Sequence, residues 1–292
     1  MTADRTPRPG VTGDSIRARL LDRALTTAIT RAGAPGRIRF TERQLYYEMC
    51  RVLRPVHTVP RRVPLTPAPP VRYERFEETL RRRDGEIPGL LAPLPASASM
   101  PYRPGEPDLY DYGLPRLLVC QSRSVARMLL ANDLHLEAAC PVFAADDAPL
   151  DPRLVVGLGR VDGATVHVLH DASTAGIALT AQVRAEVPGI RVASMGLVPR
   201  HATALHLISQ RGPAPTPLPA TAPGPAGAPS GLEPREREWL AGGRTAEVES
   251  VPPARLLRTV LRMVRGPRTS GHSVWTGLRE LRTAGFMTWP SN

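Results

Sequence analysis

The sequence predicts a mixed α/β protein with a basic helical module near its N-terminal end, a mostly parallel sheet in the middle and a small helical piece near its C-terminal end. Apolar residues recur at helical spacing in the first third, and short apolar strands alternate with helical stretches in the middle third. A proline-rich stretch precedes the last part. We therefore divide the chain into residues 12–95, 96–212, a linker at 213–231, and 232–292.

Composition excludes several enzyme classes. All 38 basic residues among the 292 are arginines. Without lysine there can be no usual Walker phosphate loop, no kinase catalytic lysine and no pyridoxal Schiff base. The net charge of +11 is uneven, because residues 1–95 contain 18 arginines and 10 acids whereas residues 96–212 contain 10 and 11. The first third is therefore the expected polyanion-facing part, with a set of solvated helix faces as the alternative.

The three cysteines are widely spaced and fit neither a disulfide framework nor a zinc site. The N-terminal stretch lacks an apolar leader, and no apolar run approaches the roughly 20 residues that span a bilayer. We expect a cytoplasmic protein without a membrane partner.

The first third predicts three helices. Apolar residues from Ile16 to Ile29 mark a helix that ends near Gly33, and a short strand follows at 37–40. Thr41 and Gln44 form a capping box that opens a second helix through Leu53. The third helix, within 71–83, carries an apolar face and the arginines Arg72, Arg75 and Arg82 around it. This order predicts a winged-helix or helix-turn-helix module whose last helix could enter a DNA major groove.

The middle third predicts strands at 116–120, 141–145 and 190–195, helices at 122–133 and 173–187, and two strands within 153–170 around an Asp162–Gly163 turn. Such alternation is typical of a parallel sheet covered by helices, with any site at the carboxyl ends of the strands. His167 and His170 would face opposite sides of a strand, which argues against a metal pair.

The second helix contains two tyrosines that helical spacing separates. Tyr46 falls on the apolar stripe, whereas Tyr47 shares another stripe with Arg43, Arg51 and Arg54. Neighbouring positive charge would lower the pKa of a phenol and stabilise the phenolate, which can attack phosphorus. The alternative is a tyrosine half-buried against arginine stems.

Two polar residues follow predicted strands. Gln121 comes after the first strand, and Asp171 comes after 166–170, two residues before Ser173. A carboxylate at a strand end is a common magnesium ligand, but one acid is too few for a metal–phosphate site. The alternative role for Asp171 is the N-cap of the following helix.

Residues 40–49, FTERQLYYEM, resemble the winged-helix motif of the topoisomerase VI A subunit and its meiotic double-strand-break relatives. In that family the second tyrosine of the pair is the nucleophile and an arginine precedes the pair, which implies Tyr47 and Arg43. Residues 117–129, 166–179 and 193–205 resemble, in order, parts of the Toprim domain that follows in the family. Gln121 and Ser173 stand where the family has acids, so the resemblance implies Mg²⁺ with only Asp171 left to hold it.

The resemblance implies a DNA-binding protein with a winged helix and a degenerate Toprim-like domain. If it is active, Tyr47 forms a 5′-phosphotyrosyl bond as a DNA transesterase, and Arg43 and Arg51 stabilise the phosphate charge. Double-stranded DNA would also be contacted by the remaining candidate arginines, Arg54, Arg72, Arg75 and Arg82. A homodimer and a separate ATPase subunit are implied as partners.

Two alternatives remain open at this point: a non-catalytic DNA-binding or regulatory module with the same fold, and a nucleotide-binding α/β enzyme.

The C-terminal part predicts two helices broken at Pro252 and Pro253. The second helix could pack on the Toprim-like sheet or pair between protomers.

Overall fold

The computed structural model describes residues 13–55, 65–83, 85–93, 113–147, 149–212 and 232–266. The proline-rich linker predicted at 213–231 lies outside these residues. The helices are α1 Gly13–Ala32, α2 Glu42–Leu53, α3 Tyr73–Arg81, α4 Arg123–Ala131, α5 Leu134–Ala138, α6 Pro152–Gly159, α7 Thr174–Glu186, α8 Pro199–Ala204, α9 Pro234–Ala241 and α10 Pro253–Arg265. The strands are β1 Arg116–Cys120, β2 Val142–Ala144, β3 Thr165–Leu169, β4 Arg191–Ser194, β5 Gln210–Arg211 and β6 Arg244–Thr245, and short 3₁₀ turns occupy Ala145–Asp147 and Val248–Ser250. Within the described ranges, no helix has the length and apolar character needed to cross a bilayer.

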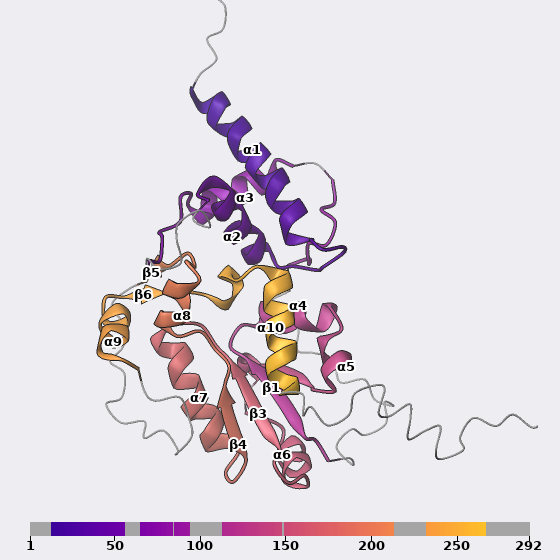
Figure 1. The fold of residues 1–292 in the computed structure, drawn as a ribbon. Coiled ribbons are helices and arrows are strands. Elements are labelled where there is room, and N and C mark those ends of the chain that lie inside the picture. Colours follow the sequence, from indigo (N-terminus) through magenta and orange to yellow (C-terminus); the bar gives the residue numbers. More distant parts are fainter. Residues whose placement is uncertain are drawn as a thin grey trace, which may run out of the picture.

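The predicted parallel sheet is confirmed. Its strands run in the order β2-β1-β3-β4, and every pair is parallel. Successive side chains of a strand point to opposite faces, so Leu117 and Val119 of β1 pack into one apolar cluster with α6 and α7, and Leu118 and Cys120 pack into another with α4 and α10. The sheet is therefore the middle of three layers (Figure 1).

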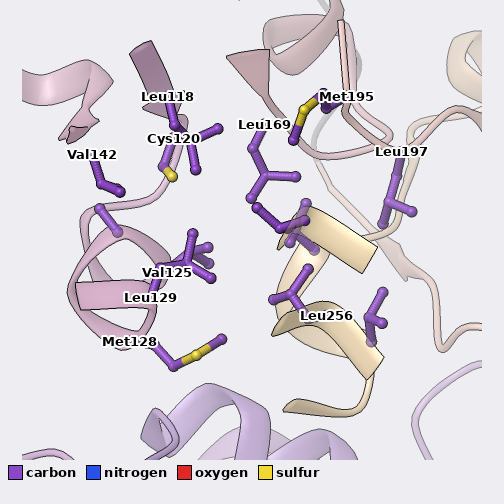
Figure 2. Packing of buried hydrophobic residues seen from close by; sticks show 14 of the residues in the cluster. Leu118, Cys120, Val125, Met128, Leu129, Val142, Leu169, Met195, Leu197 and Leu256 are labelled. Carbon is purple, nitrogen blue, oxygen red and sulfur yellow. The ribbon is translucent and has the colours of Figure 1, made fainter. Parts of the chain in front are cut away.

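The last helix, α10, packs on the sheet. Figure 2 shows Leu256 facing the side chains of α4, with Leu169 of β3 and Met195 beside it. Val260 and Val264 continue the same buried face of α10 at helical spacing. Of the two alternatives for this helix, packing within the chain is the one observed.

The N-terminal module has its own core, formed by α1, α2 and α3. The capping box predicted for α2 is present, with Thr41 Oγ1 accepting from the Gln44 amide and Gln44 Oε1 accepting from the Thr41 amide. The strand predicted at 37–40 is reduced to a single parallel bridge between Phe40 and Leu90. Gly36 and Arg37 have positive φ angles, which a strand does not accommodate.

A second prediction was wrong in the middle third, where residues 152–159 form α6 instead of a strand. Asp151 caps this helix by accepting a hydrogen bond from the Arg153 amide, and Pro152 occupies its first turn. Leu154 and Leu158 are buried four residues apart, whereas Val156 is 56% exposed. Burial that recurs every four residues has the period of a helix. The helix-start residues Asp151 and Pro152 therefore decide the local structure, although the β-branched residues that follow favour a strand.

We predict that Leu256→Ala lowers the free energy of unfolding by about 2–5 kcal/mol, because it leaves a cavity between α10 and the sheet. Leu136→Ala is the matched control, since Leu136 is 70% exposed and its loss should change stability by no more than about 0.5 kcal/mol. Urea unfolding at two protein concentrations measures both. Equal stability of the two variants, or a loss that disappears at higher protein concentration, would contradict packing within the chain.

Candidate functional site

Tyr47, the predicted nucleophile, lies inside the N-terminal module. Its side chain is 0% exposed, like that of Tyr46 at 1%. The Tyr47 hydroxyl accepts a 2.7 Å hydrogen bond from Gln210 Nε2. Burial raises the pKa of this phenol above its ordinary value, Glu247 adds to the rise, and Arg43 and Gln210 oppose it. The expectation of an accessible phenol with a lowered pKa is therefore wrong.

The reason lies in the surroundings of α2. Helical spacing separates Tyr46 from Tyr47 only if one side of the helix faces solvent. Here α1 packs on α2 and the 3₁₀ turn at 248–250 packs on it as well, so the residues from Gln44 to Cys50 are all buried. Tyr46 packs against the rings of Tyr73 and Phe76 on α3, and Tyr47 is covered where Gln210 reaches its hydroxyl.

The arginines predicted beside Tyr47 have acidic or carbonyl partners. Arg43 forms a two-point pair with Glu247, with Nε–Oε2 and Nη2–Oε1 distances of 2.8 and 2.6 Å, and its guanidinium carbon lies 5.9 Å from the Tyr47 ring centre. Arg51 pairs with Glu48 and donates to the Ser250 carbonyl. The prediction that these two side chains face DNA is not supported by their placement.

The other candidate arginines lie farther out. Arg54 is exposed and donates to the Ala68 carbonyl at 3.3 Å. On α3, Arg75 Nη1 lies 2.7 Å from Glu78 Oε2, and Arg82 Nη2 lies 3.9 Å from the same oxygen. Arg72 and Arg82 are exposed.

Residues 246–250, which we call the junction segment, bring the N-terminal module and the sheet together. Ala246 and Ala172 exchange backbone hydrogen bonds of 2.9 and 3.1 Å just past the end of β3. Glu247 then pairs with Arg43 of α2. Glu249 Oε1 accepts hydrogen bonds from Thr41 Oγ1 at 2.7 Å and from Ser124 Oγ at 2.9 Å. The segment thus connects β3, α2 and α4.

Sequence reasoning missed Glu247 and Glu249. Their signal in the sequence is an alternation of acids with the apolar Val248 in a stretch that separates two helices. Alternation predicts that the two acids share a side, but it does not say which distant residues they meet.

Three acids, Asp171, Glu247 and Glu249, lie close together where the junction segment meets the sheet. Arg43 is a basic side chain that acts on all three. Burial raises the pKa of Asp171 to about 7, Glu247 and Glu249 add to the rise, and the Val248 amide and Arg43 oppose it. Burial also raises the pKa of Glu249, against the hydrogen bonds from Thr41 and Ser124.

Gln121 and Asp171, which the resemblance aligns with acidic positions, contact each other, but the oxygens of these two residues and of Ser173 bind amides. Gln121 Oε1 accepts from the Asp171 amide at 2.8 Å, Asp171 Oδ1 from the Val248 amide at 2.7 Å, and Ser173 Oγ from the Gly176 amide at 3.0 Å. Ser173, not Asp171, is the N-cap of α7. Within the described part of the chain, no group of three His, Cys, Asp or Glu side chains could hold a metal ion. This donor set does not fit Mg²⁺.

Gly176 permits this arrangement. A Cβ atom at Gly176 would lie 2.4 Å from the Asp171 carbonyl oxygen and 2.6 Å from Gln121 Oε1. Only a glycine lets the first turn of α7 approach the two strand ends so closely.

A cavity of about 270 Å³ opens beside the junction. Its polar lining comes from both parts of the molecule and includes Thr41, Arg43, Tyr73, Ser124, Arg127 and Glu249. Such a lining can hydrogen-bond a small polar group. The Thr41 and Ser124 hydroxyls, however, already donate to the Glu249 carboxylate, the Tyr73 hydroxyl donates to Glu42, and the buried Tyr47 is not among the lining residues.

Comparisons with protein-family models, with curated proteins and with solved structures found no match to this chain. The similarity to topoisomerase VI A subunits therefore stays a prediction from motifs.

We predict that Asp171→Asn becomes progressively more stable than the wild type as the pH rises from 5 to 8. The folded-state pKa of Asp171, about 7, lies above the unfolded value of ~3.9. Its favourable contribution is therefore complete below about pH 4 and is lost as the pH rises through 7. The asparagine Oδ1 can still accept from the Val248 amide. The stability difference should grow by up to ~1.4 kcal/mol per pH unit.

Urea unfolding of both proteins at several pH values measures this difference. Titrating groups far from the junction are common to both proteins, so the comparison reports on Asp171 and on the acids coupled to it, Glu247 and Glu249. A difference that does not change with pH would show that Asp171 ionises normally in the folded protein.

Proposed function

We propose that this protein binds double-stranded DNA without forming a covalent bond, through arginines on the outer side of its N-terminal module. The observation that carries the proposal is the contact between α1 and the end of α3. Arg83 Nη1 donates to Thr26 Oγ1 at 3.0 Å, and Thr26 shares one face of α1 with the exposed Arg19 and Arg23. We call Arg19, Arg23, Arg81, Arg82 and Arg83 the α1–α3 basic surface.

The charge of this surface supports a polyanion partner. All five arginines are exposed. The acids of the same helices, which include Asp22 of α1 and Glu74, Glu77 and Glu78 of α3, offset part of their charge. In the 3.9 Å ion pair between Arg82 and Glu78, both side chains are exposed to solvent. Such a pair holds Arg82 only weakly. Arginine clusters of this kind bind phosphates by direct contact and by release of counterions.

The placement of Tyr47 favours the non-catalytic form over a DNA transesterase. A nucleophile has to reach the scissile phosphate, whereas Tyr47 is 0% exposed and hydrogen-bonded to Gln210. Gln121, Asp171 and Ser173 use oxygens to hold backbone amides. The proposal therefore contains no metal-dependent step.

The proposal extends to fold and assembly. We propose that the three N-terminal helices with the Phe40–Leu90 bridge are a reduced winged-helix module and that the sheet is Toprim-like. Gln121 and Asp171 at neighbouring strand ends support the second assignment. A homodimer and an ATPase subunit belong to the same proposal through the resemblance. The free, buried thiols of Cys50, Cys120 and Cys140 support a reducing, cytoplasmic location.

Charge reversal tests the DNA surface. Arg19→Glu combined with Arg23→Glu should weaken binding to a labelled duplex at least ten-fold and lower the slope of log affinity against log salt by about 2, as expected for two lost phosphate contacts. Arg235→Glu combined with Arg237→Glu is the matched control, because both arginines are exposed on α9. Fluorescence anisotropy across a salt series, with circular dichroism as a check of folding, measures the effect. Equal losses in the two pairs would refute a localised DNA surface.

A Tyr47→Phe variant separates binding from cleavage. We expect the wild type to leave no protein attached to DNA ends after incubation with supercoiled DNA and Mg²⁺ or Mn²⁺ followed by denaturation. The variant should bind duplex DNA as the wild type does and lose about 1–3 kcal/mol of stability, because Gln210 Nε2 loses its acceptor. Attachment by the wild type but not by the variant would establish the transesterase instead.

A further inference from the structure

Ser194 and His170 form a hydrogen-bonded pair at the carboxyl ends of two adjacent parallel strands. Ser194 is the last residue of β4, and His170 directly follows β3. His170 Nε2 lies 2.8 Å from Ser194 Oγ. The imidazole is 2% exposed, whereas Ser194 is exposed. A buried base thus contacts the hydroxyl of an exposed residue.

The second ring nitrogen fixes the direction of this hydrogen bond. His170 Nδ1 lies 2.9 Å from the Asp171 carbonyl oxygen. A carbonyl oxygen only accepts, so Nδ1 carries a proton. Burial disfavours the charged imidazolium and lowers the pKa of His170, which leaves Nε2 as the unprotonated nitrogen. Ser194 therefore donates its hydroxyl proton to His170.

The surrounding backbone holds the pair in place. The Met195 amide donates to the Val168 carbonyl, and the Leu197 amide donates to the His170 carbonyl, both at 2.8 Å. A Cβ atom at Gly196 would lie 2.3 Å from His170 Cγ, so the ring packs directly against a glycine. This preorganisation is what a positioned general base requires.

We propose that Ser194 is a nucleophile, activated by His170, that takes the acyl group of small carboxylic esters. A hydroxyl that donates to a neutral imidazole held by its other nitrogen is the arrangement that activates serine for acyl transfer. Ser194 is an exposed residue at the end of β4, and its hydroxyl points toward His170 at the neighbouring strand end. A substrate would approach this pair from the solvent side, which favours small, unhindered esters.

The reaction balances with water as the only co-reactant. Ser194 Oγ forms a bond to the ester carbonyl carbon while its proton moves to His170 Nε2. The bond between that carbon and the alcohol oxygen then breaks, and the leaving alcohol takes the proton from Nε2. Water, deprotonated by the same nitrogen, hydrolyses the acyl-serine and restores both side chains.

Labelling of the full chain with a fluorophosphonate probe and turnover of p-nitrophenyl acetate test the site. Peptide mass spectrometry should place the label on Ser194, and Ser194→Ala should remove both labelling and turnover. Ser122→Ala is the control, because Ser122 also follows a strand of the sheet but has Ser124 and the Val125 amide as its hydrogen-bond partners. It should keep wild-type labelling.

The contribution of His170 is tested by a variant that can still hydrogen-bond. His170→Gln should reduce the labelling rate on the order of 100-fold, the size of a general-base contribution. Because His170 is buried, circular dichroism checks that this variant folds. In addition, Ser194→Cys should react with iodoacetamide faster than the Ser194→Cys/His170→Gln double variant. Labelling of the wild type no faster than that of Ser194→Ala, or equal rates for the two cysteine variants, would overturn the proposal. Neither result bears on DNA binding.

Discussion

The pairing of Ala246 with Ala172 is the constraint on which the junction of the two parts depends. Two backbone hydrogen bonds fix the junction segment against the end of β3. The same placement directs Glu247 toward Arg43 and Glu249 toward Thr41. If this pairing shifted by one residue, the side chain of Glu247 would point away from Arg43, because side chains alternate along an extended chain, and the 3₁₀ turn that holds Glu249 would move with it.

Asp171, Glu247 and Glu249 lie together in a partly buried place at the junction. Positive charge balances only part of their negative charge. Arg43 is the charge that opposes all three, since it lowers the pKa of both Asp171 and Glu249 while it pairs with Glu247. The remaining compensation comes from neutral donors, namely the Val248 amide and two hydroxyls. Neutral donors satisfy a carboxylate's hydrogen bonding without cancelling its charge. Together with burial, this explains why the pKa values of Asp171 and Glu249 are raised.

Periodicity in the sequence predicted the structure correctly where a residue's surroundings come from its own helix or strand and from its neighbours in the sequence. It predicted β1, β3, α4 and α7, the capping box of α2 and the core position of Tyr46. It did not predict the burial of Tyr47 or the partner of Arg43. Those depend on Gln210 and Glu247, which lie 163 and 204 residues away along the chain. The resemblance aligned Gln121 and Asp171 with acidic positions but did not reveal that their oxygens bind amides.

The position of the junction segment also bears on how the chain is made. Its long-range hydrogen bonds reach residues 74 (246 − 172) to 208 positions earlier in the sequence. On the ribosome, α1–α3 and β1–β4 emerge while Thr41, Ser124 and Asp171 still lack their acceptors or donors. Cotranslational folding can begin in the two parts separately, but their union waits for a stretch that is synthesised after α1–α3 and β1–β4, and a nascent chain halted before Ala246 would present both unfinished surfaces to chaperones.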